Sequence, residues 1–381
     1  MPAIGIVAGE ASGDVLGGEL MSALRKRAPE VEFAGVGGPR MQRHGMRSLA
    51  DIDNLSINGL VQPVLRLPAL WGLMNQLESA LQAVDVFVGV DFNVFNLRLE
   101  WRLRRRRIPT AHYVSPSVYA WRRGRVQRIG KSTDVVMTLF PFEPSIYEGT
   151  DVRAEFVGHP LAEEIAPPVD RAADQRRARE LLGLRHDGST IALMPGSRES
   201  ELKRMGPLFL EAASEMVRIG SMTSVQFVVP CPHDRARCKM ESLVAAHPGL
   251  DVSIVESGSH EALRAADLVL VKAGTGTLEA LLTRTPMVVT YLADPISFAI
   301  VRRMMHTSHI ALPNILAGRE LVPELLQDVV SPRRLAEALL GELRRCREES
   351  ELMREFDKIH RSLLGGGADR AAEIVLSLLG K

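Results

Sequence analysis

The sequence has few cysteines, lacks long apolar runs and carries no excess of charge of either sign. Its 381 residues include three cysteines without a paired spacing, which argues against a disulfide framework and indicates a reducing compartment. Because no run approaches about 18 apolar residues, we expect no transmembrane helix. No charged N-terminal region with a cleavage site is present, so we expect no export signal and a cytoplasmic protein. The 47 Lys and Arg residues balance 46 Asp and Glu residues, so the overall charge does not indicate nucleic acid.

The usual signatures of dinucleotide- and triphosphate-binding loops are missing as well. The loop at 9–14, G-E-A-S-G-D, has neither the G-x-G-x-x-G spacing nor a Walker pattern, which disfavours a dehydrogenase. We expect instead that this loop lets a substrate approach the backbone. Asp14 then either caps a helix or faces the substrate.

What the sequence does contain is an alternation of short apolar runs and helical patterns. In the first half, helical patterns begin near Gly13, Pro39, Pro68, Asn93 and Val126, and the apolar runs are 4–8, 33–36, 84–90, 110–114, 135–139 and 155–157. The runs of the second half are 191–194, 225–229, 252–255, 268–271 and 287–290. This alternation predicts an α/β protein with two doubly wound, Rossmann-like domains. We place these domains at 1–165 and 166–350, followed by C-terminal helices within 351–381.

Two turns in the second half suit an anion. In 191–201, I-A-L-M-P-G-S-R-E-S-E, we expect free backbone N–H groups, the Ser197 hydroxyl and the Arg198 guanidinium to converge after Gly196. The alternative is an ordinary loop with a surface arginine. The second turn starts a helix with Gly274, Thr275, Gly276 and Thr277, which suits a diphosphate. Glu279 follows where a carboxylate accepts hydrogen bonds from a ribose diol.

The first half offers a candidate general base. Asp91 follows the apolar run 84–90, so we expect it at the carboxyl edge of a strand, where a carboxylate can take a proton from a hydroxyl. The alternative is a cap on the helix that starts near Asn93. Asn96 is placed to line the same cleft. The loop at 113–122 adds hydroxyl and aromatic residues that suit a sugar or an acyl chain, or that attach the loop to the core.

Two further stretches point to a lipid or to an anion, each with a simpler alternative. The segment 62–74, Q-P-V-L-R-L-P-A-L-W-G-L-M, is either a core helix or an amphipathic segment that enters a membrane interface. Arginines and one lysine crowd 98–131, where they form either a patch for anionic lipid or phosphate or a solvated helix face.

An ordered set of strings closely resembles the lipid-A-disaccharide synthase family, whose members are two-Rossmann-domain (GT-B) glycosyltransferases. The strings are G-E-A-S-G-D (9–14), G-V-G-G-P-R-M (35–41), F-V-G-V-D (87–91), H-Y-V-S-P-S-V-Y-A-W-R (112–122), V-G-H-P-L (157–161), L-M-P-G-S-R-E-S-E (193–201) and S-H-I-A-L-P-N-I-L-A-G-R-E-L-V-P-E-L-L-Q (308–327). Any one of them is weak evidence, but their order along the chain is specific.

The resemblance implies a reaction and the residues that carry it. A 2,3-diacylglucosamine passes from UDP to the 6-hydroxyl of 2,3-diacylglucosamine 1-phosphate, with inversion and without a metal or another cofactor. The essential Asp, Arg and Asn of the family correspond to Asp91, Arg198 and Asn314, and the conserved acid of the nucleotide loop corresponds to Glu279. With the resemblance in view, we expect further UDP-side contacts from Gly196, Ser197, Gly274, Thr275, Gly276, Thr277 and Arg319. On the acceptor side we expect Glu10, Ser12, Gly13, Asp14, Asn96, Ser115 and Ser117.

The resemblance also implies a protein peripheral to the inner face of the cytoplasmic membrane, with a C-terminal helix that returns to the first domain. The same segment can instead exchange between two subunits, because Gly365, Gly366 and Gly367 form a hinge before it. The chain departs from the family pattern at Asn58, Gln62, the Asp91 loop and Ala273. The rival interpretations are another UDP-sugar transferase or epimerase of the same fold, and an inactive UDP-sugar- or lipid-binding protein.

Overall fold

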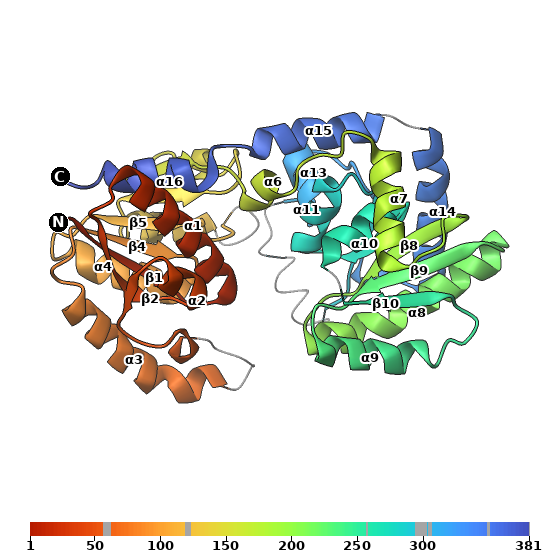
Figure 1. The fold of residues 1–381 in the computed structure, drawn as a ribbon, viewed down its shortest axis with the longest axis horizontal. Coiled ribbons are helices and arrows are strands. Elements are labelled where there is room, and N and C mark those ends of the chain that lie inside the picture. Colours follow the sequence, from red (N-terminus) through yellow and green to blue (C-terminus); the bar gives the residue numbers. More distant parts are fainter. Residues whose placement is uncertain are drawn as a thin grey trace. The chain divides into compact units, whose positions relative to one another are not determined.

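The computed structural model describes residues 1–55, 62–118, 123–256, 258–293, 303, 307–348 and 351–380. Asn58 and the end of the 112–122 string lie outside the described residues, as does the side chain of Gln62. The chain divides into two compact units (Figure 1). Unit 1 comprises Met1–Glu163 with Ser362–Lys381, and unit 2 comprises Glu164–Arg361.

Unit 1 is built on a parallel sheet of seven strands in the order β3-β2-β1-β4-β5-β6-β7. The strands are β1 (Ala3–Ala8), β2 (Glu32–Val36), β3 (Met46–Ser48), β4 (Val86–Val90), β5 (Thr110–Tyr113), β6 (Val135–Thr138) and β7 (Arg153–Phe156). The pairing of β1 with β4 ends at Ala8 and Val90. The loops that follow these strands therefore emerge next to each other at the carboxyl edge of the sheet.

Helices cover both faces of the unit 1 sheet. The α-helices are α1 (Ala11–Arg27), α2 (Pro39–Arg43), α3 (Gln62–Ala80), α4 (Asn93–Arg104), α5 (Val126–Gly130), α6 (Pro160–Glu164) and α16 (Gly367–Leu376), and the short 3-10 turns are η1 (Ile52–Asn54), η2 (Arg123–Arg125) and η3 (Pro144–Tyr147). Apolar residues of α1, α2 and α16 pack on one face, and those of α3 and α4 pack on the other. The inner strands β1, β4 and β6 are buried between these helices, so they are nearly continuous apolar runs, which the sequence showed.

Unit 2 is built on a parallel sheet of six strands in the order β10-β9-β8-β11-β12-β13. The strands are β8 (Ser189–Met194), β9 (Val225–Pro230), β10 (Val252–Val255), β11 (Leu268–Lys272), β12 (Met287–Tyr291) and β13 (Glu324–Leu326). The register of β8 with β11 pairs Met194 with Val271, so the turns after these two strands are also neighbours.

The helices of unit 2 form two layers around this sheet. They are α7 (Arg171–Leu182), α8 (Glu199–Gly220), α9 (Asp234–Val244), α10 (Ser259–Ala265), α11 (Thr275–Leu282), α13 (Leu312–Ala317), α14 (Pro332–Glu348) and α15 (Glu351–Leu363), with the 3-10 turn η4 (Gln327–Val329). Apolar residues of α8, α9 and α14 share one core with the sheet. The predicted class of two doubly wound α/β domains with a returning C-terminal helix is confirmed.

The structure differs from the sequence analysis at three places. The short strands β3 and β13 were not predicted, because three residues are too few for a pattern and each is held by its neighbour in the sheet. Pro68 lies inside α3 rather than at its start. The helix continues past this proline because Leu73, Met74 and Leu77 are buried beyond it.

Candidate active site

The turn between β4 and α4 places Asp91 at the carboxyl edge of the unit 1 sheet, as predicted. Asp91 and Phe92 both adopt left-handed backbone angles, with φ of 48° and 46°. Such angles are strained for residues with a side chain and persist only where the surroundings hold them. The backbone N–H of Asp91 donates to Tyr113 O at 2.8 Å, and Asn96 Nδ2 donates to Asp91 O at 2.9 Å. The carboxylate is therefore presented from a rigid turn.

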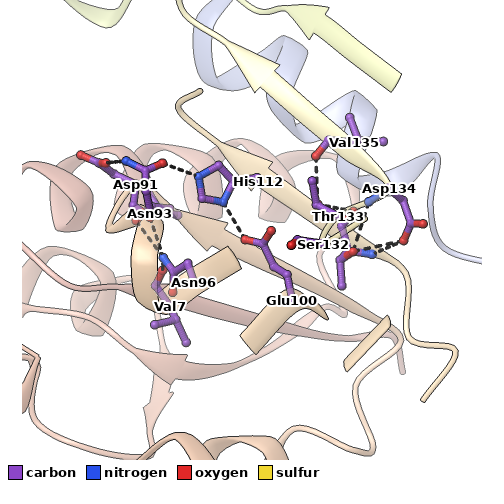
Figure 2. A network of polar contacts seen from close by, with 12 residues as sticks. Val7, Asp91, Asn93, Asn96, Glu100, His112, Ser132, Thr133, Asp134 and Val135 are labelled. Carbon is purple, nitrogen blue, oxygen red and sulfur yellow. Dashed lines mark hydrogen bonds and ion pairs between the residues drawn. The ribbon is translucent and has the colours of Figure 1, made fainter. Parts of the chain in front are cut away.

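A chain of polar side chains runs from Asp91 into the core of unit 1 (Figure 2). Asn93 Nδ2 donates to Asp91 Oδ1 at 3.0 Å, and the amide oxygen of Asn93 faces His112 Nε2 at 2.9 Å. On the other side of the ring, His112 Nδ1 faces Glu100 Oε1 at 2.7 Å. We call Asp91, Asn93, His112 and Glu100 the Asp91 chain.

The hydrogen-bond geometry of the Asp91 chain indicates where the protons on His112 and Glu100 lie. An amide oxygen only accepts hydrogen bonds, so His112 Nε2 carries a proton toward Asn93. Nδ1 and Glu100 Oε1 lie 2.7 Å apart, so a second proton has to lie between them, because two lone pairs would repel each other at that distance. Burial raises the pKa of the fully buried Glu100, and His112 opposes that rise. The pair is neutral overall whichever partner holds the shared proton, which is the condition for burying it in an apolar core.

The 9–14 loop lies beside this turn, and its glycines serve close packing. A Cβ on Gly9 would lie 2.4 Å from the Phe92 ring, so the loop and the Asp91 turn fit together only with glycine there. Gly13 is buried against β1. The buried Asp14 carboxylate accepts hydrogen bonds from the backbone N–H groups of Arg40 and Met41, at 2.9 and 3.0 Å. Of the two expected roles for Asp14 this is capping, although the capped helix is α2 and not its own α1.

The remaining acceptor-side candidates divide into exposed and buried residues. Glu10, Ser12 and Ser117 are exposed. Asn96 is fully buried and donates to Val7 O and Val90 O as well as to Asp91 O. Ser115 is buried, and its hydroxyl pairs with Tyr147 Oη at 2.7 Å. Asn96 of α4 thus supports the Asp91 turn, and Ser115 supports the loop after β5.

In unit 2, Gly196, Ser197 and Arg198 form the turn between β8 and α8. The expected free backbone N–H groups are not free, because those of Ser197 and Arg198 donate to Glu201 Oε2 at 3.2 and 3.3 Å. Gly196 has φ of 118°, and a Cβ there would lie 2.4 Å from the same Glu201 oxygen. A carboxylate of the chain itself occupies the turn that the sequence predicted for an anion. The Arg198 side chain remains 80% exposed, although it contacts Glu201 at 3.4 Å.

Lys272 connects this turn to the neighbouring one. Lys272 is the last residue of β11, and its Nζ lies 3.1 Å from Glu201 Oε1. Burial opposes ionisation of Glu201, but Lys272 and the backbone N–H of Arg198 outweigh it and lower the pKa of that carboxyl. The carboxylate is therefore charged and balances Lys272. Beyond β11, Gly274 and Thr275 are exposed at the N-terminus of α11, while Gly276 is half-buried.

The other UDP-side candidates form hydrogen bonds or ion pairs with residues of unit 2. The hydroxyl of the buried Thr277 donates to Gly274 O at 2.8 Å, and Ser259 Oγ donates to the Glu279 carboxylate. Thr277 Oγ1 also accepts from Leu312 N at 3.4 Å, which joins the start of α13 to α11. The exposed Arg319 side chain lies 3.6 Å from Glu355 on α15.

Asn314 is fully buried, and both ends of its amide are hydrogen-bonded. Its oxygen accepts from the backbone N–H groups of Leu321 and Val322, at 2.7 and 2.9 Å. Its nitrogen donates to Val322 O and to Glu324 Oε1. In this structure Asn314 therefore holds the segment between α13 and β13, which includes Arg319.

The sequence analysis did not identify five residues that organise these turns: Asn93, Glu100, His112, Glu201 and Lys272. A signal for one of them was present. The buried stripe of α4 contains two polar residues four positions apart, Asn96 and Glu100, among Phe95, Leu99 and Leu103. Buried polar side chains are normally hydrogen-bonded, so this pattern predicts polar partners for Asn96 and Glu100 inside unit 1. Among the described residues, no cluster of three or more His, Cys, Asp or Glu side chains suits a metal ion.

Comparison with known proteins places this geometry in a family. The model of the lipid-A-disaccharide synthetase family matches residues 4–375. A lipid-A-disaccharide synthase of Azotobacter vinelandii is 46% identical over 381 residues, covering 98% of this chain and 97% of the relative. The chain belongs to the lipid-A-disaccharide synthase family. A synthase of this family from Pseudomonas syringae pv. tomato is 45% identical over 379 residues, covering 99% and 97% of the two chains.

Solved structures with lower identity share the fold. The calicheamicin glycosyltransferase CalG4 aligns with a TM-score of 0.61 at 18% identity, covering 100% of this chain and 99% of the other. MurG of Acinetobacter baumannii aligns with a TM-score of 0.57 at 13% identity, covering 98% and 99%. The predicted GT-B fold and the assignment to this family of glycosyltransferases are confirmed. No helix among the described residues is long and apolar enough to cross a membrane.

Proposed function

We propose that the protein transfers 2,3-diacylglucosamine from UDP to the 6-hydroxyl of 2,3-diacylglucosamine 1-phosphate. The products are the β-1,6-linked disaccharide 1-phosphate and UDP, in lipid A biosynthesis. The observation that carries this proposal is the family match across residues 4–375. The rigid Asp91 turn and the two neighbouring turns of unit 2 supply side chains that suit the chemistry.

The reaction is a single displacement at the anomeric carbon of the donor. Asp91 takes the proton of the acceptor 6-hydroxyl as its oxygen attacks that carbon. The bond from the carbon to the diphosphate breaks, its electrons leave with UDP, and the configuration inverts. Asn93 occupies Oδ1 of Asp91 at 3.0 Å, which leaves Oδ2 for the hydroxyl. The Asp91 chain fixes the orientation of this carboxylate, as a positioning network does for a catalytic base.

Unit 2 stabilises the departing UDP. Arg198 places an exposed guanidinium next to Gly196 and Ser197, and Gly274, Thr275, Gly276 and Thr277 add the N-terminus of α11. Glu279 accepts hydrogen bonds from the ribose. Arg319 contributes a second cation, and Asn314 acts through the segment that it holds. We propose further that the diphosphate displaces the Glu201 contacts at the turn, since both compete for the same backbone N–H groups.

Unit 1 binds the acceptor at the carboxyl edge of its sheet. Glu10, Ser12 and Ser117 are exposed for contact with the sugar. Gly13, Asp14, Asn96 and Ser115 are buried and hold the neighbouring turns in place. A substrate with acyl chains requires access to a bilayer, so we propose that the protein works at the inner face of the cytoplasmic membrane, in peripheral contact with anionic lipid.

A homodimer that exchanges α16 between two copies would keep the contacts that α16 makes within one chain. Sedimentation at several protein concentrations tests it, because an exchanged dimer gives a mass near twice that of one chain.

The decisive experiment incubates the protein with both substrates and identifies the products by mass. We expect a disaccharide phosphate and one UDP per turnover. Asp91→Asn should lower kcat by roughly 10²- to 10⁴-fold, because it removes the base and keeps the shape. Arg198→Ala should lower kcat by roughly 10²- to 10³-fold, because it removes charge stabilisation at the leaving group.

Exposed matched variants control for general damage. Asp151→Asn in unit 1 and Arg204→Ala on α8 alter the same residue types and should retain normal turnover. A wild-type protein that yields no disaccharide phosphate would overturn the proposed reaction. Normal turnover in Asp91→Asn would overturn the assignment of the base alone.

A further inference from the structure

A pocket of unit 1 lies directly beside the Asp91 chain. It has a volume of about 310 Å³ and lies between α4, the η2–α5 segment and the loop after β5. Asn93, whose side chain donates to Asp91 Oδ1, forms part of its wall. A molecule in this pocket therefore lies next to the residue that orients the candidate base. The volume is at the lower end of the roughly 300–1,000 Å³ typical of small-molecule sites.

The wall of this pocket carries cations and no carboxylate. Its lining includes Arg98, Arg125, Arg128 and Lys131, and it contains neither Asp nor Glu. None of these four forms an ion pair with a described carboxylate. Three arginines at the end of α4 and just after it behave differently, because Arg102 and Arg106 pair with Glu78 and Arg104 pairs with Asp134. The four cations around the pocket therefore have no neutralising carboxylate among the described residues.

The rest of the wall is apolar. Leu97, Trp101 and Ile129 line it, together with Val94, which is 80% exposed. The guanidinium of Arg98 lies 4.9 Å from the centre of the Trp101 ring, which holds this cation at the edge of the apolar surface. Cations beside an apolar wall match a ligand that has an anionic group next to a hydrocarbon chain.

We propose that this pocket binds the phosphate and the adjoining acyl chain of the acceptor, an acylated sugar phosphate. The inference rests on the proposed function and adds where the acceptor phosphate lies. Phosphate is attracted to the four cations, and the chain covers Leu97, Trp101 and Ile129. The sugar then lies over Asn93 with its free hydroxyl at Asp91. The pocket thereby selects a phosphorylated acceptor over a neutral one, because an unoccupied cation cluster attracts only the former.

The test compares two acceptors in neutral detergent micelles, one with the 1-phosphate and one without it. In the wild-type protein we expect a higher kcat/KM for the phosphorylated acceptor. The double variant Arg128→Ala/Lys131→Ala should lower kcat/KM for that acceptor by roughly 10- to 100-fold through KM, as expected for two lost charged contacts. Its kcat/KM for the acceptor without phosphate and its KM for the donor should stay within about twofold. Both altered side chains are exposed, so the fold should remain intact.

The control Lys26→Ala/Arg47→Ala removes the same charge from exposed sites elsewhere in unit 1 and should behave as wild type. An equal loss for both acceptors, or no loss for either, would overturn the inference.

Binding to lipid vesicles tests whether these cations bind the phosphate of the acceptor or the anionic headgroups of a membrane. We expect the Arg128→Ala/Lys131→Ala variant to bind phosphatidylglycerol vesicles about as well as the Lys26→Ala/Arg47→Ala control does. A variant that loses vesicle binding and keeps its preference for phosphorylated acceptor would assign these cations to the lipid surface instead. Calorimetric titration with the acceptor alone measures acceptor binding without the reaction. It therefore distinguishes a wrong acceptor pocket from a wrong proposed reaction. If the wild type makes no disaccharide but binds the phosphorylated acceptor more tightly than the variant does, only the reaction is wrong.

Discussion

Burying Glu100 and His112 in an apolar core costs desolvation free energy. Both side chains are fully buried, and they lie 2.7 Å apart between β5 and α4. Hydrophobic residues of the same volume would fill this space at similar or lower cost, so the pair is weak evidence for stability alone. Its connection through Asn93 to Asp91 suggests why it is there. We infer that the pair keeps the amide of Asn93, and hence Asp91, in one orientation.

Replacing His112 tests this positioning role. His112→Ala should lower kcat by roughly 10- to 100-fold with little change in KM, because a base displaced by about 1 Å loses that much. The variant should also lose roughly 3–5 kcal/mol of stability, because Glu100 is left buried without its partner. Kinetics are measured well below the melting temperature, and the exposed His186→Ala serves as control. Wild-type kcat in a folded His112→Ala protein would disprove the role.

Glu143 makes the stability of unit 1 depend on pH. Burial raises its pKa to about 7 from a usual value of 4.5, although the backbone N–H groups of Phe140 and Leu139 favour the charged form. Between these values the folded protein keeps a proton that the unfolded chain has lost. The contribution of Glu143 to the free energy of unfolding is therefore largest below pH 4.5, and it decreases as the pH rises toward 7. The difference amounts to at most about 3 kcal/mol.

The corresponding measurement is the melting temperature between pH 4.5 and 8. Glu143→Gln cannot ionise, so its melting temperature should fall less across this range than that of the wild type. Glu148→Gln removes an exposed carboxyl nearby and should reproduce the wild-type slope. Parallel curves for wild type and Glu143→Gln would show that the Glu143 carboxyl does not titrate in this range.

Among the elements, β4 and α4 together form the support for Asp91. A Cβ on Gly89 of β4 would lie 2.1 Å from Glu100 Oε1 and 2.8 Å from the Asn96 Cβ. The strand therefore needs glycine at this position because polar side chains of α4 pack directly on its backbone. The requirement comes from packing, since Gly89 is not among the residues with positive φ.

Gly89→Ala should cost roughly 1–3 kcal/mol of stability, as overpacking does, and should lower kcat because Glu100 and Asn96 both have to move. The free energy of unfolding from urea titration and the kcat of the same preparation measure the two effects. Gly72→Ala on α3 is the matched control, because a Cβ there meets nothing within 4 Å and alanine favours a helix. A Gly89→Ala protein as stable and active as Gly72→Ala would refute the packing argument.

For the whole molecule, the last helix completes the first unit. Ala371, Ala372, Ile374 and Val375 of α16 are buried in the same core as Leu20 of α1. Arg27 of α1 forms ion pairs with Asp369 and Glu373. Helix α15 belongs mainly to unit 2, where Asp357 pairs with Arg284. The chain therefore passes between the units near Glu163 and again near Arg361.

Removal of residues 362–381 should destabilise unit 1 and spare unit 2. The deletion exposes the apolar face of α1, so hydrogen exchange should accelerate in α1 and β1 and stay unchanged in β8 and β11. Mass spectrometry of exchanged peptides locates the effect in each unit. Asp369→Asn, which removes one ion pair and keeps the helix, should change exchange only slightly. Unchanged exchange in α1 after the deletion would show that α16 contributes no stability to unit 1.

Local sequence patterns were enough to predict the class of fold and the sheet edges at which the candidate site residues lie. Apolar runs alternating with helical patterns predicted parallel sheets, and all eleven expected runs lie within two residues of observed strand ends, as β10 illustrates with 252–255 in both. The ordered strings also indicated the family. These features are visible because they depend on residues near each other along the chain.

Which polar side chains meet depends on the packing of the folded chain. Asp14 caps α2, Glu201 occupies the turn after β8, and Glu100 meets His112 twelve residues away along the chain. Each pairing depends on strand register and on the way a helix packs on a sheet, which the local pattern does not encode. The same holds for β3, β13 and α16, whose places are set by long-range contacts. The turns that the sequence predicted to be open for substrates are therefore partly filled by the chain's own groups.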